Sequence, residues 1–170
     1  MSLLDRLTAE GPKRILSIDG GGIRGAATIG FLKRIETLLR ERHQDENLVL
    51  SDYFDLIGGT STGAIIAALL ARGRTVKYVK EKYLNLGERV FSTKAPFLKK
   101  TKIRFDAKAL EEELENEFEE LTLGDPKIKT GLCIVVKRAD TGSTWPLINH
   151  PQNMFADNLG FLIRDILRAS

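Results

Sequence analysis

The chain has 170 residues, one domain's worth of sequence and enough to bury a hydrophobic core. Its 42% hydrophobic content, 29% charged content and net charge of +3 are typical of a globular protein, and the charge is too small to argue for nucleic acid. The single cysteine, Cys133, excludes an intramolecular disulfide and is expected to pack as a small hydrophobe in a strand.

The amino-terminal residues 1–12 are a polar lead-in that ends on a Gly-Pro pair. Charges stand where a signal peptide would carry its apolar core, and the longest apolar run, over 64–71, is too short to span a bilayer. We therefore expect a cytoplasmic protein whose contact with membranes is at most peripheral. Residues 14–19 are predicted to form a short buried strand, because their apolar residues are bounded by turn residues.

A glycine-rich loop follows this strand directly, over 20–25. Its glycines permit positive φ and let N–H groups approach a ligand closely. An amphipathic helix over 26–42 and a polar connection over 44–47 then complete a βαβ unit. The glycine spacing also fits a dinucleotide-binding fingerprint, but the second strand ends in Gly-Gly-Thr, without the acidic residue that this fingerprint needs.

The stretch over 53–70 is the most informative part of the chain. It begins as an apolar strand (YFDLIGG), turns on a Gly-x-Ser-x-Gly segment centred on Ser61, and continues as an apolar helix over 62–71. A serine between two such glycines lies on a tight strand-to-helix turn that presents its hydroxyl, as an acyl-transfer nucleophile requires. A phosphate-binding P-loop is excluded, because Ala64 stands where its lysine should be.

The remaining elements are predicted from periodicity. We expect helices over 76–86, 106–120 and 159–167, and strands over 132–136 and 144–148. Asp106 would cap the second of these helices, whose seven glutamates we assign to a solvated face. No partner is evident for the apolar side of the last helix, which predicts an uncovered patch.

Basic and aromatic residues are interspersed over 89–105. A solvated loop is one interpretation of this composition. The alternative is an interfacial patch that attracts anionic lipid head groups and inserts phenylalanine side chains, which gives a peripheral membrane contact through 89–105.

The glycine-rich loop and the Ser61 turn are expected to lie side by side. Loops that leave the carboxyl ends of neighbouring parallel strands open on the same edge of a sheet. The N–H groups of Gly20, Gly21 and Gly22 could then donate to an oxyanion formed when Ser61 attacks a carbonyl, and the amide of Thr62 could add a further donor.

Three segments of the chain, SIDGGGIRG over 17–25, FDLIGGTSTGAIIAALLA over 54–71 and ILRAS over 166–170, resemble motifs of one family, the patatin-like phospholipases. The resemblance implies a three-layer α/β/α fold with a mainly parallel sheet, in a single domain over 1–170. It implies a serine acyl hydrolase with a Ser–Asp dyad and an acyl-enzyme intermediate, acting on phospholipids or other acyl esters without metal or cofactor.

The resemblance also assigns residues. Ser61 is then the nucleophile, and Gly20, Gly21 and Gly22 lie at the oxyanion hole. Four further residues match motif positions that shape the loop and the turn and take no part in catalysis: Arg24, Gly25, Gly59 and Gly63.

One part of the family pattern has no match. The family's general base is an aspartate followed by Gly-Gly or Gly-Ala, and the only Asp-Gly pair here is Asp19-Gly20, in the oxyanion loop. We expect the base to lie outside this chain, the fold to be incomplete at its carboxyl end, and the 170 residues alone to be inactive. Two alternatives remain, a Ser61, Asp140 and His150 triad, and a non-catalytic module that binds lipid or nucleotide through the glycine-rich loop.

Overall fold

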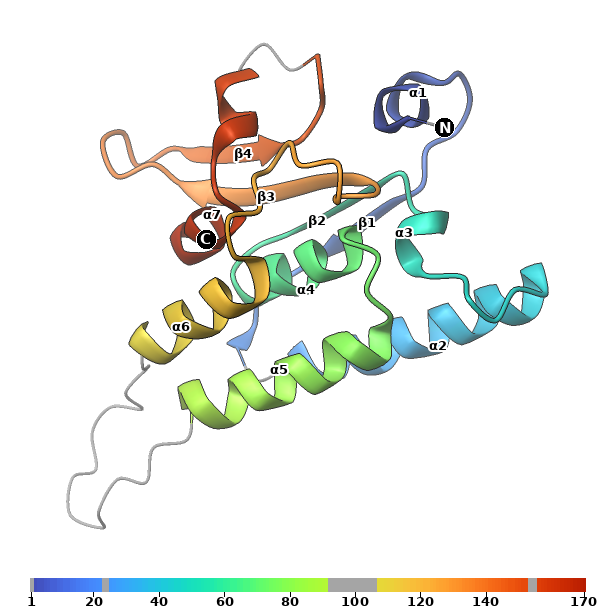
Figure 1. The fold of residues 1–170 in the computed structure, drawn as a ribbon, viewed down its shortest axis with the longest axis horizontal. Helices are drawn as coiled ribbons and strands as arrows, with labels where there is room; N and C mark the ends of the chain where they lie inside the picture. The colour runs from blue at the N-terminus through green and yellow to red at the C-terminus, as the bar shows by residue number, and fades with distance from the viewer. Residues whose placement is uncertain (1, 23–24, 92–106, 153–155) are drawn as a thin grey trace.

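A computed structural model of the chain describes residues 2–22, 25–91, 107–152 and 156–170 (Figure 1). Its centre is a four-stranded sheet in the order β1 (Ile15–Ile18), β2 (Leu56–Gly59), β3 (Gly131–Lys137) and β4 (Thr144–Ile148). The first three strands are parallel, and β4 returns antiparallel to β3 as a hairpin. The predicted α/β fold with a mainly parallel sheet is therefore confirmed.

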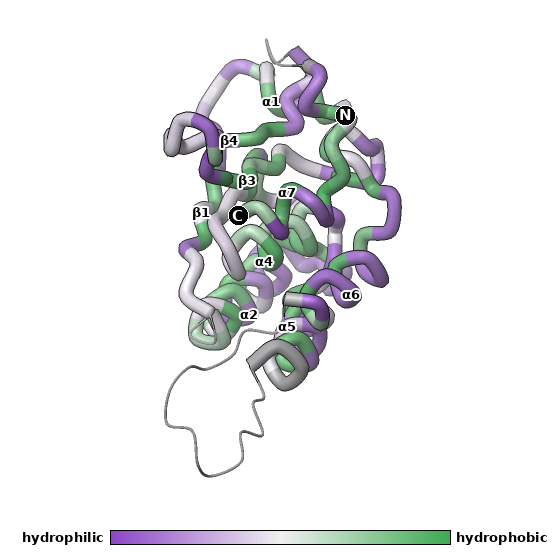
Figure 2. The backbone as a smooth tube through the Cα atoms, turned by 90° about the vertical axis from the view of Figure 1, so that its left-hand side faces the viewer, coloured by the Kyte–Doolittle hydropathy of each residue, from purple (hydrophilic) through white to green (hydrophobic). Residues whose placement is uncertain are grey.

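Helices cover the sheet, and α4 (Thr62–Ala71) is the central one. Every residue of α4 is buried, because α4 packs on β1, β2 and β3 on one side and beneath the outer helices on the other. The outer helices are α2 (Gly25–His43), α5 (Val76–Phe91) and α6 (Ala107–Phe118), with α7 (Ile163–Ala169) beside β3 and α6 (Figure 1). Figure 2 shows hydrophobic segments in this interior and hydrophilic segments on outer helices such as α6.

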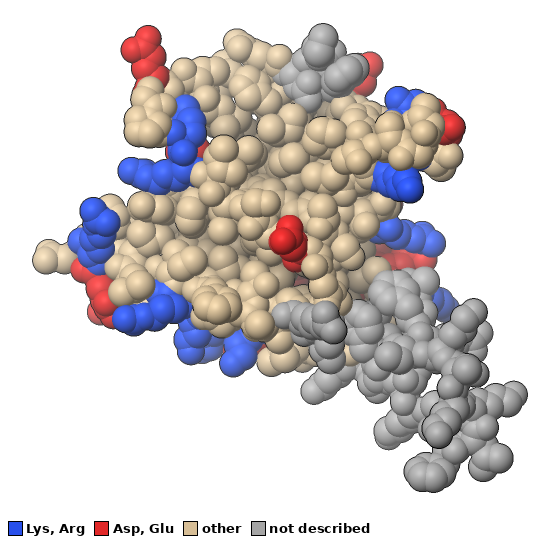
Figure 3. All heavy atoms as spheres, turned by 180° about the vertical axis from the view of Figure 1, so that it is seen from behind, with Lys and Arg blue, Asp and Glu red and all other residues tan. Residues whose placement is uncertain are grey.

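The opposite face of the sheet carries α1 (Leu3–Thr8) at one end, where Leu7 approaches Gly131. Seen from behind, the molecule presents a broad face of mostly uncharged side chains, with an acidic side chain near its centre and Lys and Arg gathered toward its rim (Figure 3). Two large hydrophobic side chains are strongly exposed, Ile15 of β1 and Phe31 of α2. Among the described helices, none combines the length and the apolar character that a membrane span requires.

Four predicted boundaries are wrong. Helix α5, predicted over 76–86, continues to Phe91. The strand before Ser61 begins at Leu56, because residues Leu50–Tyr53 form a short helix, α3, whose Asp52 carboxylate accepts the Val49 amide. Helix α6 ends at Phe118, where Glu119 adopts a positive φ of 47°. The last helix begins at Ile163 rather than at 159, because Ala156–Gly160 form a 3-10 helix, η2, and residues 161–163 then hydrogen-bond to 121–123.

Three predictions about surfaces are also wrong. Strand β1 is not buried along its length, since Ile15 is 63% exposed and Ile18 is its one buried residue. The last helix does not leave its apolar side uncovered, since Ile163, Ile166 and Leu167 are at most 4% exposed. The glutamates of α6 are not all solvated, since Glu117 is 8% exposed and pairs with cations of neighbouring elements. The loop over 89–105 and the Asp106 cap lie outside the described residues, apart from the backbone of the last turn of α5.

Candidate active site

Ser61 lies on the turn between β2 and α4, as predicted. Its backbone adopts φ 51° and ψ −127°, a combination that costs a non-glycine residue about 1–3 kcal/mol. The side chain is exposed, and its hydroxyl has no hydrogen-bond partner within the part of the chain that the structure describes. The turn thus presents an unengaged hydroxyl at the amino-terminal end of a buried helix, where the helix dipole favours negative charge.

The two glycines that flank Ser61 let strand and helix approach closely. A Cβ on Gly59 would lie 2.5 Å from the carbonyl carbon of Gly63. A Cβ on Gly63 would collide with the backbone oxygen of Ile18 and come within 2.7 Å of that of Asp19. Because these neighbours are backbone atoms that cannot rotate away, both positions require glycine, and the first turn of α4 packs directly against the end of β1.

The glycine-rich loop lies beside Ser61, which is the juxtaposition that the sequence predicts. A Cβ on Gly20 would be only 2.9 Å from the Cβ of Ser61. The amide of Gly20 donates to Thr60 Oγ1 at 3.0 Å, and the amide of Gly21 donates to Thr62 Oγ1 at 3.2 Å. Two threonine hydroxyls of the Ser61 turn therefore hold the loop in place.

The prediction that the Gly20 and Gly21 amides donate to an oxyanion is therefore wrong, because both already donate to these two threonine hydroxyls. Two other amides at this place remain available. The amides of Gly22 and Thr62 donate to no acceptor among the described residues. Gly22 itself adopts a positive φ of 52°. Arg24, the basic position of the loop, lies outside the described residues, so its predicted role in shaping the loop stays a prediction.

Tyr83 of α5 supports the glycine-rich loop, and this role was not predicted from the sequence. Its hydroxyl donates to the carbonyl of Gly22. Burial raises the pKa of Tyr83, so the phenol stays protonated and keeps its donor. A Cβ on Gly25 would come within 2.8 Å of the Tyr83 ring carbon Cζ, which explains the last glycine of the loop. One signal in the sequence could have found it. A tyrosine among the apolar residues of the helix predicted over 76–86 is expected to be buried, and a buried phenol needs a hydrogen-bond partner.

The alternative triad of Ser61, Asp140 and His150 is contradicted by the fold. Asp140 lies in the β3–β4 turn, near the sheet edge that carries Ser61, and pairs with Arg138. His150 follows the far end of β4, where its Nδ1 accepts the amide of Gln152. The five residues of β4 separate the two by about 17 Å at a rise of about 3.4 Å per residue.

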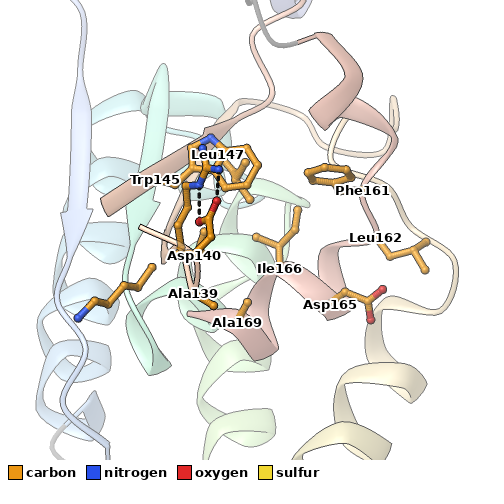
Figure 4. Close-up of a pocket in the computed structure, with 12 residues that line it drawn as sticks. Ala139, Asp140, Trp145, Leu147, Phe161, Leu162, Asp165, Ile166 and Ala169 are labelled. Atoms are coloured by element: carbon orange, nitrogen blue, oxygen red, sulfur yellow. Dashed lines mark hydrogen bonds and ion pairs between the residues drawn. The ribbon is translucent and has the colours of Figure 1, made fainter. Parts of the chain in front are cut away.

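An apolar groove of about 550 Å³ opens between the β3–β4 hairpin and α7 (Figure 4). Trp145 and Leu147 of β4 form one wall, and Phe161 and Ile166 approach from the other side. The Arg138–Asp140 ion pair stands at its rim, and Arg138 also lies 5.5 Å from the centre of the Trp145 ring. Val136 and Ala169 also line the groove.

Comparison with known proteins identifies the family. A family model described as patatin-like phospholipase matches residues 16–170. The chain is 36% identical over 177 residues to the cUMP-AMP-activated phospholipase of Escherichia coli, covering 99% of this chain and 50% of that protein. It is 30% identical over 148 residues to Patatin-17 of Solanum cardiophyllum, covering 82% and 36%.

A third relative is similar over a shorter part. The chain is 40% identical over 81 residues to a cGAMP-activated phospholipase of Escherichia coli strain TW11681, covering 48% of this chain and 23% of that protein. The chain thus spans half or less of the length of each of these relatives. With the family model matched over nearly the whole sequence, the chain belongs to the patatin-like phospholipase family.

Proposed function

We propose that this protein is a lipid acyl hydrolase of the phospholipase A or lysophospholipase type, with Ser61 as its nucleophile. The observation that carries the proposal is the strained, exposed serine between Gly59 and Gly63, placed against a glycine-rich loop whose Gly22 amide has no acceptor among the described residues. This is the arrangement that acyl transfer needs, because the nucleophile and the donors for the developing oxyanion then converge on one carbonyl.

The reaction follows from this geometry. Ser61 Oγ attacks the ester carbonyl and gives up its proton to a general base. The oxyanion accepts hydrogen bonds from the amides of Gly22 and Thr62, which donate to no acceptor among the described residues. Each such donor stabilises the transition state by about 3 kcal/mol. The C–O bond then breaks, the alcohol leaves with a proton, and water hydrolyses the acyl-enzyme to release a fatty acid.

We assign the general base to an aspartate that these 170 residues do not include. The described residues offer no hydrogen-bond partner for the Ser61 hydroxyl, and the Asp140–His150 pair is divided between two edges of the sheet. Without a base the serine hydroxyl is a weak nucleophile at neutral pH, so the 170 residues alone are expected to be inactive.

The apolar groove beside α7 is our candidate for the acyl chain. Ala169 is one of its lining residues, and the next residue, Ser170, accepts a hydrogen bond from the amide of Ser61. The groove therefore includes the residue next to the hydrogen-bond partner of Ser61, and its lining is largely apolar, as a fatty acyl chain requires.

Phe161→Ala tests this assignment. Removing a ring that is 41% exposed at the groove should lower kcat/KM for long-chain esters by about tenfold and leave short-chain esters unchanged, because only long chains reach it. The measurement is kcat/KM against a series of p-nitrophenyl esters. Phe31→Ala on α2 is the matched control, since that ring is 74% exposed and lies outside the groove. Equal losses for short and long chains would contradict the assignment.

Two of the relatives are named for activation by a cyclic nucleotide, one of them similar over 99% of this chain. We therefore propose such a nucleotide as an activator of this protein too. The competing hypothesis is a non-catalytic module that binds lipid or nucleotide without hydrolysis.

One experiment separates these possibilities. The full-length protein is incubated with phosphatidylcholine vesicles, with and without cUMP-AMP or cGAMP, and in parallel with a fluorophosphonate followed by intact mass and peptide mapping. We expect release of fatty acid, faster with one of the nucleotides, and a single adduct on Ser61. A folded protein that forms no adduct, releases no fatty acid and only gains thermal stability with nucleotide would support the binding module instead.

A further inference from the structure

Ser170 joins the nucleophile to the sheet. Its hydroxyl accepts a hydrogen bond from the amide of Ser61 at 2.8 Å. The same hydroxyl donates to the carbonyl of Val135 in β3 at 2.6 Å. One side chain, 109 positions along the chain from Ser61, thus bridges the turn and a central strand.

The bridge fills a gap in the parallel ladder. β2 pairs with β3 only as far as Gly59 and Ile134, because the chain turns toward Ser61 there, while β3 continues to Lys137. Hydrogen bonds with the β4 side are made by Leu132 and Arg138, so the alternation of an antiparallel pair directs the Val135 carbonyl to the β2 side. The hydroxyl of Ser170 supplies the donor that β2 no longer provides.

Ser170 is itself held firmly. It follows α7, and its amide donates to the carbonyl of Leu167. Three side chains of α7 are buried against the sheet, α4 and α6, namely Ile163, Ile166 and Leu167. The hydroxyl is therefore placed by a packed helix, as a supporting group for a reactive side chain should be.

We infer that Ser170 is a positioning residue for the proposed nucleophile. It does not contact the substrate, but it fixes the Ser61 amide, and with it the strained φ and ψ from which the Ser61 hydroxyl projects. Because the Ser61 amide donates to Ser170, it is not an oxyanion donor, which leaves that role to the amides of Gly22 and Thr62. The inference rests on the proposed function of Ser61.

The test compares Ser170→Val with Ser170→Thr in the full-length protein. The two side chains are nearly isosteric, and only threonine keeps the hydroxyl, so their difference isolates the hydrogen bonds from packing. For Ser170→Val we expect kcat for phospholipid and the second-order rate of fluorophosphonate labelling to fall together by about tenfold to a hundredfold, at unchanged KM, because small displacements of a nucleophile have effects of this size. Ser170→Thr should retain both rates within about threefold.

Ser51→Ala is the matched control for the loss of a buried hydroxyl. Ser51 Oγ in α3 is buried without a hydrogen-bond partner among the described residues, so both rates should stay at the wild-type value. Labelling rates are measured below the melting temperature of each variant, so a less stable variant is still compared in its folded state. Equal rates for Ser170→Val and wild type, or equal losses for Val and Thr, would overturn the inference alone. A wild type that is not labelled at Ser61 would overturn the proposed function, and this inference with it.

Discussion

Ser61→Ala is expected to lower kcat for phospholipid hydrolysis by about 10⁴-fold or more, with KM within about twofold of wild type. The substitution removes the atom that attacks the carbonyl, so any residual reaction has to come from bound water. The groove and the oxyanion donors remain, because the Ser61 hydroxyl holds no part of the surrounding structure by hydrogen bonds in the described chain. Ground-state binding is therefore preserved.

The measurement is fatty acid release at saturating substrate, on the full-length protein. Ser17→Ala is the control, because Ser17 is an exposed serine of the neighbouring strand β1. Circular dichroism and the melting temperature show whether both variants fold. If Ser61→Ala kept a tenth of the wild-type kcat, another residue would have to be the nucleophile.

A second substitution at the same position tests the strain. Values of φ 51° and ψ −127° are unfavourable for any residue with a Cβ and open to glycine. Ser61→Gly should therefore be as inactive as Ser61→Ala, yet more stable than it by about 1 kcal/mol. A glycine variant that is less stable than the alanine variant would show that the turn is not strained.

The part of the site that could be predicted from the sequence is the part encoded locally. Strand, glycine-flanked serine and helix are contiguous, and residue type alone gives all three. The general rule for parallel sheets then brings the glycine-rich loop to the same edge. The close approach of Gly20 to Ser61 confirms that step.

The supporting residues could not be predicted, because they come from distant parts of the chain. Tyr83 is 61 positions from Gly22, and Ser170 is 109 positions from Ser61. Nothing in the local sequence of either residue indicates that its hydroxyl meets a backbone group there. The same limit explains the wrong prediction for α7, whose apolar side is covered by α4, α6 and β3 rather than by its neighbours in sequence.

Glu117 shows most clearly how contacts with distant residues can be missed from the composition of a segment, here the glutamate-rich helix α6. Its carboxylate accepts a hydrogen bond from Tyr78 Oη at 2.7 Å and lies 2.9 Å from Lys82 Nζ, so it ties α6 to α5. It also lies 3.3 Å from the guanidinium of Arg72, which donates to the Glu117 carbonyl as well. Among the α6 glutamates that helical periodicity places on a solvated face, this one closes the corner where α4, α5 and α6 meet.

The protonation states of its partners support this role at neutral pH. The hydrogen bond to Glu117 raises the pKa of Lys82 above its usual 10.5. Burial, followed by the hydrogen bond to Glu117, raises the pKa of Tyr78. Because a raised lysine pKa contributes stability that is complete below the unfolded-state value, the Lys82 contribution is fully present at pH 7 and is lost only as the pH rises through the folded-state pKa.

Glu117→Ala is therefore expected to lower the free energy of unfolding by about 2–3 kcal/mol. Removing one partner of a buried ion pair typically costs about 3–5 kcal/mol, and the lower figure applies because Lys82 and Arg74 keep part of their contact with water. Urea denaturation followed by circular dichroism measures the change. Glu115→Ala, two positions earlier on the exposed side of α6, should stay within about 0.5 kcal/mol of wild type.

The outcome also decides what kind of interaction holds this corner. Glu117→Gln keeps the shape and an acceptor for Tyr78 but removes the charge, so a loss close to that of alanine assigns the stability to charge pairing. If only the Glu117→Ala variant loses stability, the stability of this corner comes from the hydrogen bonds and the packing. Equal stability of the Glu117→Ala and Glu115→Ala variants would contradict both explanations. Glu117 would then contribute no more to stability than an exposed glutamate of α6.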